Sequence, residues 1–339
     1  MGKPRVVLIY RSAARGGFSI ENVFSSIASR LSREAEVTEY FLTSKWGSIR
    51  DIVRLLRLRA DVYHITGDVH YLALVLPRRK VVLTVHDTYY LQHGVRGLKR
   101  FIYRLVWFQL PLCCAERVTA ISTVTRDSLA ATSSRVMRKT RVIPDPVHPD
   151  FVPRANVPTN AKPRLLFIGT AEHKNLTRTI SAIQHMDCEL VIIGSLSKAT
   201  LANLFEAGIE YSNLAGLEMS QVYEQYCQAD VLVFPSLREG FGLPILEAQA
   251  VGVPVVTSSL PPMNEIAGEG ACLVDPYDVE SIGVGISRVI ADSDYRDGLV
   301  AGGRENVTRY SADAVATEFL SLYHEMVMLT LSRMDSREA

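Results

Sequence analysis

The sequence predicts an α/β protein built from two doubly wound parallel sheets that face each other across a cleft. Short apolar strand candidates alternate with amphipathic stretches, which is typical of parallel sheets with helices on both faces. The 339 residues are too many for one ordinary core and fit two domains of about 150 residues each. A proline-rich stretch near the middle separates the two series of strands.

The elements are predicted from apolar runs and their boundaries. Strands are expected at 5–10, 37–41, 62–66, 81–85, 117–121 and 141–143 in the first domain, and at 164–168, 190–193, 231–234 and 254–258 in the second. Residues 144–158 hold five prolines and suit neither a helix nor a central strand, so they are the predicted linker. The domains are therefore 1–150 and 151–311. Apolar side chains at spacings of three and four predict a helix over 312–334.

Composition excludes several classes of protein. The apolar fraction is 47%, yet no apolar run approaches the roughly 20 residues of a membrane span. The first apolar segment, 6–10, lacks the pattern of a signal peptide, so a cytoplasmic location is expected. The five cysteines are scattered without CxxC spacing, which argues against a disulfide framework and a zinc site.

The net charge of +1 hides an asymmetry between the halves of the chain. Residues 1–155 hold 25 Lys+Arg against 12 Asp+Glu, whereas the remainder holds 12 against 24. This segregation predicts that the N-terminal half faces something anionic. The alternative is that the basic and acidic halves attract each other.

The segment 234–258 carries the most informative pattern. A short strand is followed by a glycine-rich turn and a helix, with Gly240 and Gly242 in the turn and Pro244 at the expected first helical position. The backbone amides of such a helix start suit an anion. Glu239 in the loop and Glu247, expected in the first helical turn, could bind the hydroxyls of a sugar and of a ribose. The alternative is a purely structural strand–loop–helix unit.

This segment resembles the signature of the family-4 retaining glycosyltransferases, the group 1 family, in which E-G-F-G-L-P-x-x-E-A and G-x-P-V-V recur. Residues 261–268 and 271–276 are similar to the next block of the family, 166–170 and 173–175 to its phosphate-binding strand and loop, and 214–217 to its nucleobase loop. Weaker similarity covers 61–64, 84–87, 120–122 and 142–144. The resemblance implies the GT-B fold, two Rossmann-like domains whose last helix often packs back on the first domain.

The resemblance also implies a site. The catalytic residues would be Lys174 at the leaving phosphates, Glu239 at the sugar hydroxyls and His86 near the transferred sugar. The family often has an arginine where Thr170 stands, and this departure removes one cation or passes its role to His173 or to an arginine of the other domain. The implied donor-binding residues are Glu247, Gly240, Phe241, Gly242, Leu243, Gly17, Gly169, Thr170, Leu217 and Met219.

Two features of the N-terminal half leave alternatives open. Gly16 and Gly17 follow the first strand beside Arg11 and Arg15, so they form either an anion site or only a turn. His86 could equally be a structural residue. His64, His70 and Asp68 fit no compact metal spacing, and His64 is expected in the core.

The resemblance implies a retaining, metal-independent hexosyltransferase that uses a UDP- or GDP-sugar as substrate and needs no cofactor. Residues 94–111, with Arg96, Lys99, Arg100 and Arg104, predict a basic amphipathic helix that either docks on an anionic membrane or packs in the core. A lipid-linked saccharide in cell-surface polysaccharide assembly is the expected acceptor, with peripheral attachment to the inner membrane face and no nucleic-acid partner. The alternatives are an epimerase or hydrolase of the same fold and a non-catalytic nucleotide-sugar-binding subunit.

Overall fold

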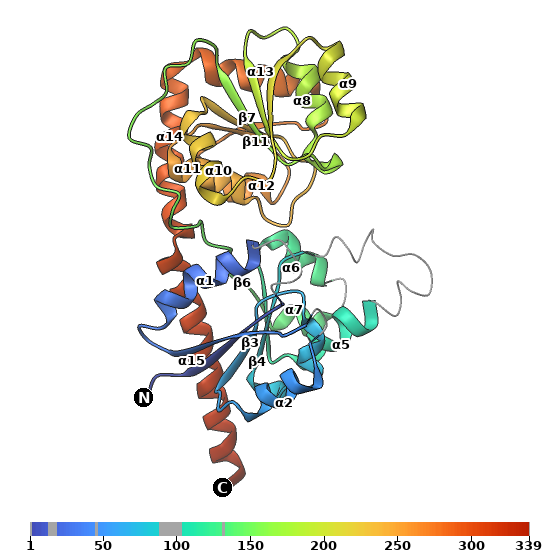
Figure 1. Ribbon diagram of the computed structural model, residues 1–339. Helices are drawn as coiled ribbons and strands as arrows, with labels where there is room; N and C mark the ends of the chain where they lie inside the picture. The colour runs from blue at the N-terminus through green and yellow to red at the C-terminus, as the bar shows by residue number, and fades with distance from the viewer. Residues whose placement is uncertain (1, 13–18, 45–46, 88–103, 131–132, 339) are drawn as a thin grey trace. The chain divides into compact units, whose positions relative to one another are not determined.

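The computed structural model describes residues 2–12, 19–44, 47–87, 104–130 and 133–338. They form two compact units (Figure 1). Unit 1 consists of Met1–Pro146 and Ala312–Ala339, and unit 2 of Val147–Ser311. The chain passes from unit 1 to unit 2 inside the predicted linker, four residues before the expected boundary.

Unit 1 is a six-stranded parallel sheet in the order β2-β1-β3-β4-β5-β6. The strands are β1 (Arg5–Tyr10), β2 (Glu36–Phe41), β3 (Val62–Ile65), β4 (Val81–Val85), β5 (Arg117–Ala120) and β6 (Thr140–Val142). The helical elements are α1 (Ser19–Leu31), α2 (Ile49–Arg57), η2 (His70–Leu74), η3 (Arg78–Lys80), the π-helix η4 (Arg104–Gln109), α5 (Leu110–Cys114), α6 (Thr123–Ala130), α7 (Ser134–Arg138) and α15 (Ala312–Glu338). Alternating side chains of the central strands point to opposite faces, and both faces are covered.

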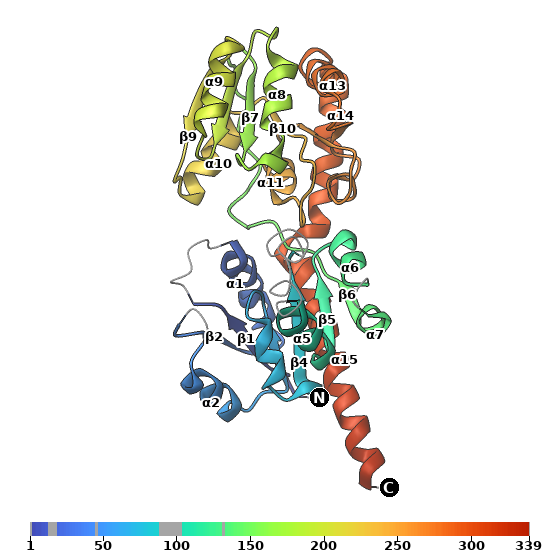
Figure 2. The same cartoon turned by 90° about the vertical axis from the view of Figure 1, so that its right-hand side faces the viewer.

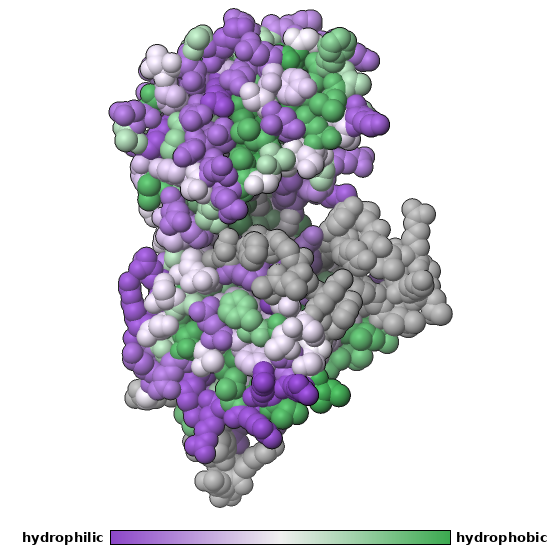
Figure 3. Space-filling view, in the orientation of Figure 1, coloured by the Kyte–Doolittle hydropathy of each residue, from purple (hydrophilic) through white to green (hydrophobic). Residues whose placement is uncertain are grey.

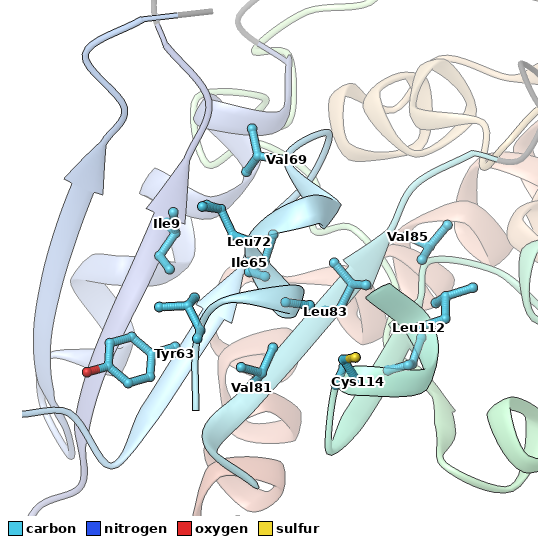
Figure 4. Close-up of a cluster of buried hydrophobic side chains, with 14 of the residues drawn as sticks. Ile9, Tyr63, Ile65, Val69, Leu72, Val81, Leu83, Val85, Leu112 and Cys114 are labelled. Atoms are coloured by element: carbon cyan, nitrogen blue, oxygen red, sulfur yellow. The ribbon is translucent and has the colours of Figure 1, made fainter. Parts of the chain in front are cut away.

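One face of this sheet packs under η2 and α5 (Figure 4). Ile65, Leu83 and Val85 from the strands meet Leu72 and Leu112 from these helices in a buried cluster. On the other face α1 runs beside α15, as Figure 1 shows. The C-terminal helix thus belongs to unit 1.

Unit 2 is a second six-stranded parallel sheet, in the order β12-β11-β10-β7-β8-β9. Its strands are β7 (Arg164–Ile168), β8 (Glu189–Ile193), β9 (Glu210–Leu214), β10 (Val231–Phe234), β11 (Val255–Ser258) and β12 (Cys272–Val274). Its helical elements are η5 (Glu172–Lys174), α8 (Leu176–Ile183), α9 (Lys198–Glu206), α10 (Met219–Gln228), α11 (Leu243–Val251), α12 (Met263–Ala267), α13 (Val279–Ala291), α14 (Ser293–Val307) and η6 (Thr308–Tyr310). Figure 2 shows β9 at one edge of the sheet and β7 and β10 toward its middle.

The strand order of unit 2 reverses between β7 and β10. The first strands of the unit run outward from β7 in one direction, and the later strands run outward from β10 in the other. The loops that follow the two strands consequently diverge, and ligands of doubly wound sheets bind at the carboxyl ends of strands at such a point. The topology therefore directs attention to the residues just after Ile168 and Phe234.

None of the helices in the described part of the chain combines the length and the apolar composition needed to cross a bilayer. The longest of them, α15, owes its burial to the sheet of unit 1, where Phe319 and Tyr323 are almost fully buried.

Candidate active site

A charge pair joins the two loops at the point where the strand order of unit 2 reverses. Lys174, at the end of η5 after β7, places its Nζ 2.7 Å from Oε1 of Glu239 in the loop after β10. The same Nζ lies 4.6 Å from the ring centroid of Phe234. The side chains of Lys174 and Glu239 are only 18% and 12% exposed, so the pair is largely shielded from solvent.

Gly169 makes room for the lysine. Its φ is +90°, and a Cβ at this position would lie 2.9 Å from Cε of Lys174. Glycine is therefore required both by the left-handed backbone and by the close passage of the lysine stem. Next to it, the Thr170 hydroxyl donates to the carbonyl of Ser195 at 2.7 Å, so this side chain joins the loops after β7 and β8.

Two helices begin beside the Lys174–Glu239 pair. Asn175 precedes α8 in a left-handed conformation, and its side-chain amide donates to the carbonyls of Pro235 and Pro276 at 3.0 and 2.7 Å. Gly242, with φ +125°, precedes α11. Two helix starts thus accompany the lysine at the carboxyl edge of the sheet, where a diphosphate would find positive charge and donors.

Glu247 is the fifth residue of α11, so the expectation that it lies in the first helical turn is wrong. The helix starts at Leu243, and Pro244 is its second residue. The Tyr226 hydroxyl on α10 donates to Oε2 of Glu247 at 2.7 Å. Burial raises the pKa of the Glu247 carboxyl, although the Tyr226 hydrogen bond and the Lys174 charge favour the ionised form. The helix dipole therefore does not decide the protonation of this group. The sequence pattern gave no sign of Tyr226.

The other expected donor-binding residues of unit 2 have different environments. Gly240 lies in the loop after β10, beside Glu239. Phe241 is almost fully buried and packs edge-on against Tyr310 at a centroid distance of 6.0 Å, so its side chain belongs to the interior and only its backbone could meet a ligand. Leu217 and Met219 flank Glu218, the residue that caps α10, and both are half-buried.

His86, at the end of β4 in unit 1, has both ring nitrogens engaged. Its Nε2 donates to the Thr66 carbonyl at 2.7 Å, and its Nδ1 lies 3.4 Å from Oδ2 of Asp145. Burial disfavours the imidazolium, but the Asp145 carboxylate and the Thr66 carbonyl outweigh burial, so the pKa of His86 is raised. The side chain is thus anchored at the carboxyl end of the strand by contacts that favour its protonated form.

Of the residues in the predicted anion site after the first strand, the structure describes Arg11. Arg11 pairs with Glu21 at 2.7 Å and with Asp68 at 3.0 Å, so its charge is already neutralised by carboxylates. Gly16, Gly17 and Arg15 lie outside the described residues, as do Arg96, Lys99 and Arg100 of the expected basic helix. The described part of that segment is η4 and α5, which continue to Cys114.

The prediction that His64 lies in the core is confirmed. This residue is fully buried and bonds to Tyr323 and Thr84, both at 2.7 Å. Burial lowers its pKa to about 3. His70 is likewise buried, and its pKa is lowered to about 4.

Comparison with known proteins agrees with the architecture. The model for glycosyl transferases group 1 matches residues 151–306, and that for glycosyltransferase family 4 matches residues 6–151. Escherichia coli O-antigen chain mannosyltransferase B is 31% identical over 197 residues, which cover 51% of this chain and 51% of the relative. Salmonella typhimurium O-antigen chain mannosyltransferase RfbU is 26% identical over 212 residues, 60% of this chain and 59% of the relative. The chain thus spans somewhat over half the length of these two curated relatives.

Solved structures show the same fold at low identity. Sucrose-phosphate synthase from Thermosynechococcus elongatus superposes with a TM-score of 0.75 at 17% identity, covering 96% of this chain and all of that one. Anabaena HepE in complex with UDP and glucose superposes with a TM-score of 0.73 at 15% identity, covering 95% of this chain and all of that one. With two family models that together cover residues 6–306, the chain belongs to the group 1 glycosyltransferases of family 4, and its two α/β units have the GT-B fold.

Proposed function

We propose that this protein is a glycosyltransferase that moves a hexose from a nucleoside-diphosphate sugar to an acceptor hydroxyl with retention of configuration. The observation that carries the proposal is the Lys174–Glu239 pair, which lies between the starts of α8 and α11 at the reversal of strand order. A cation and two helix starts suit the diphosphate, and a carboxylate beside them suits sugar hydroxyls.

The roles follow from the charges that develop in the reaction. The bond from the anomeric carbon to the diphosphate oxygen breaks, and the new negative charge on that oxygen is met by Lys174 and the helix N–H groups. The acceptor oxygen forms the new bond on the same face, and its proton passes to the departing phosphate. Glu239 holds the sugar hydroxyls and forms no covalent bond. Because this side chain already bonds Lys174, donor binding must redistribute the pair.

Glu247 is assigned to the ribose of the donor. One of its carboxylate oxygens accepts from Tyr226, which leaves the other for a ribose hydroxyl. The side chain is half-buried, so it remains reachable from solvent. The nucleobase would lie toward Leu217 and Met219. A UDP- or GDP-sugar is the proposed donor, and UDP in the HepE complex supports a uridine nucleotide as the first choice.

Purified protein, a panel of nucleotides and radiolabelled sugar donors test this function. A nucleotide that binds only the folded state at 100 times its Kd stabilises the fold by about 2.7 kcal/mol, so a thermal-shift screen of UDP, GDP and ADP identifies the base. Transfer of label to a saccharide acceptor, undiminished by a chelator, is the expected outcome. Release of free sugar as the only product would favour a hydrolase, an acceptor-independent change of stereochemistry an epimerase, and binding without turnover a non-catalytic subunit.

We further propose a lipid-linked saccharide as the acceptor, reached by peripheral docking on the inner membrane face. The two O-antigen mannosyltransferases among the relatives support an acceptor of this class. Within the described residues, the surface that suits docking is the outer face of α2. We call it the α2 face: Ile49, Val53 and Leu56 are exposed on it, and Arg50, Arg54 and Arg57 lie beside them.

The α2 face is presented by a firmly held helix. Asp51 and Leu55 are buried, and Ser48 and Asp51 form a reciprocal capping box at the helix start. Ile49 keeps 82% exposure, which is unusual for a large aliphatic side chain in a stable helix. In Figure 3 apolar and hydrophilic colours adjoin in this region of unit 1. Apolar side chains between arginines are the pattern of an interfacial helix.

A further inference from the structure

Unit 2 has a pocket at the edge of its sheet opposite the Lys174–Glu239 pair. Its volume is about 600 Å³. Pro163, Asp230 and Pro254 line it, and each stands just before a strand, at the starts of β7, β10 and β11 respectively. Because the strands are parallel, their starts and their ends lie at opposite edges. The pocket is thus separate from the candidate active site.

Two stretches of chain form the walls of this pocket. One is a single face of α14, where Arg296, Val300 and Arg304 recur every four residues. The other is the segment 154–160, which includes the end of the predicted linker. Both stretches are neighbours in sequence of the passages between the units, and the backbone N–H of Val147 donates to the Tyr310 carbonyl at 2.9 Å.

The charge of the pocket runs against that of the unit. Unit 2 holds 11 Lys+Arg against 20 Asp+Glu, yet the charged residues that line this pocket are three basic ones, Arg154, Arg296 and Arg304, and two acidic ones, Asp230 and Asp297. Arg296 is committed to the fold, because it donates to the carbonyls of Val289 and Ile290 at 3.3 and 2.9 Å. Arg296 thus caps the C-terminal end of α13, and its charged side chain lines the pocket.

Arg154 and Arg304 keep unused donors. Arg154 donates to the Ala229 carbonyl at 2.7 Å, but its Nε is buried without a partner. Arg304 is exposed and makes no hydrogen bond or ion pair with any described residue. Its guanidinium lies over Gly252, with one nitrogen 3.3 Å from the place of a Cβ there.

Arg154 and Arg304 line the same pocket. Burial lowers the pKa of Arg154, and the charge of Arg304 lowers it further, against the opposing effect of Asp230. Asp230 also lines the pocket, and its Oδ2 accepts from the backbone N–H of Arg164 and from Asn160, both at 2.8 Å. Two basic side chains with spare donors in one pocket leave a place for an anion.

We propose that this pocket binds a phosphomonoester with an apolar body. The phosphate would accept from the guanidinium groups of Arg304 and Arg154, because guanidinium groups match phosphate oxygens in geometry and charge. The rest of the ligand would lie against the apolar wall of Val157, Ile290 and Val300. The site is additional to that of the nucleotide-sugar donor, and its ligand touches both stretches of chain that lead to and from unit 1.

Calorimetric titration of the full chain with phenyl phosphate tests the proposal. Arg304→Gln is the decisive variant, because it removes the charge without breaking a described contact. The expected result is at least tenfold weaker binding in R304Q, with unchanged binding in Arg309→Gln, an equal charge change in η6 outside the pocket. A K174A protein separates this site from the donor site and should bind phenyl phosphate as the wild type does.

Titrations with phenyl phosphate, inorganic phosphate and phenol show which part of the ligand is recognised. Phenyl phosphate should bind more tightly than inorganic phosphate, because the ring buries apolar surface, and phenol should not bind measurably. Equal affinities of the wild type and R304Q would overturn the proposal, as would loss of binding in K174A alone. Equal binding of phenyl phosphate and inorganic phosphate would overturn the assigned apolar body. Circular dichroism confirms that R304Q is folded.

Discussion

The ammonium group of Lys174 lies 2.7 Å from a carboxylate oxygen of Glu239, although 65 residues separate the two in sequence. The loops that follow β7 and β10 are therefore tied together before any substrate arrives. A diphosphate that enters the site must compete with Glu239 for the lysine. The ion pair thus holds the Lys174 ammonium in position and keeps the Glu239 carboxylate where a sugar would lie.

Replacement of Lys174 by alanine should lower turnover by about 100-fold or more, because the lost charge opposes the negative charge that grows as the donor bond breaks. The apparent affinity for the donor should change much less. Steady-state kinetics with saturating acceptor measures both parameters. Lys198→Ala, which removes an exposed lysine at the start of α9, is the matched control and should behave as the wild type. Rescue of K174A by a divalent cation would contradict the metal-independent mechanism.

Replacement of Gly169 by alanine should displace Lys174 and reduce turnover by at least about tenfold, since small errors of position at a reacting group are costly. The added Cβ would lie 2.9 Å from Cε of Lys174. Gly208→Ala gives a close control, because Gly208 also has a positive φ of +64° but nothing within 4 Å of its would-be Cβ. Equal activity losses in the two variants would assign the effect to backbone strain alone.

The pH dependence of nucleotide binding should report on Glu247. Ionised Glu247 is the form that accepts from ribose hydroxyls, and burial raises its pKa, so affinity should fall at a higher pH than for an ordinary glutamate as the solution is acidified. Tyr226→Phe removes a hydrogen bond to the charged form, so it should raise the midpoint by about one pH unit. The reference curve is that of Glu247→Gln, which lacks this titration. A wild-type profile parallel to that of E247Q would remove Glu247 from the ribose site.

The imidazole of His86 should titrate above pH 6.5 in the folded protein, because Asp145 and the Thr66 carbonyl hold its proton. The stabilising effect of this pair should be present below the unfolded pKa and be lost as the pH rises through the folded value. NMR titration of the ring, assigned by the missing signal in His86→Gln, gives the folded pKa directly. Asp145→Asn should lower it. A His86 pKa that stays the same in D145N would show that the carboxylate is not its source of charge stabilisation.

Flotation of the protein with liposomes tests the α2 face. Binding to anionic vesicles should exceed binding to neutral ones and weaken in high salt, since each basic residue near the surface contributes about 1 kcal/mol. The double variant R50Q/R57Q should bind anionic vesicles less than the wild type. R135Q/R138Q, with the same change of charge on α7, is the control. Equal recovery with both lipid types would remove electrostatic docking.

The strands were predictable where they are buried on both faces. The runs at β1, β4, β7 and β10 agree with the sequence pattern to the residue, because each is a short apolar segment. The edge strand β9 is missing from the pattern, since Glu210–Leu214 is polar and mostly exposed and has only one neighbouring strand. An edge strand is defined by backbone pairing, and its side chains need not show it.

In the candidate site, the sequence predicted only residues that lie within motifs, and it did not predict their contacts. Motif similarity identified Lys174 and Glu239, but their contact depends on the strand order, which no local pattern contains. Tyr226 lies 21 residues before Glu247 and on another helix, so its hydrogen bond could not be read from spacing. The place of Glu247 in the first helical turn was wrongly inferred because the helix starts earlier than expected.

The position of α15 affects the order in which the two units can fold during synthesis. His64 in β3 bonds to Tyr323, 259 residues later, and Phe24 packs against Phe319, so the core of unit 1 needs residues that are synthesised after the whole of unit 2. Unit 2 is one uninterrupted segment, 147–311, and has its whole core available earlier. During synthesis unit 2 can therefore complete its fold while unit 1, although begun first, still exposes the apolar face of its sheet. The order of folding is the reverse of the order of the two units in the sequence.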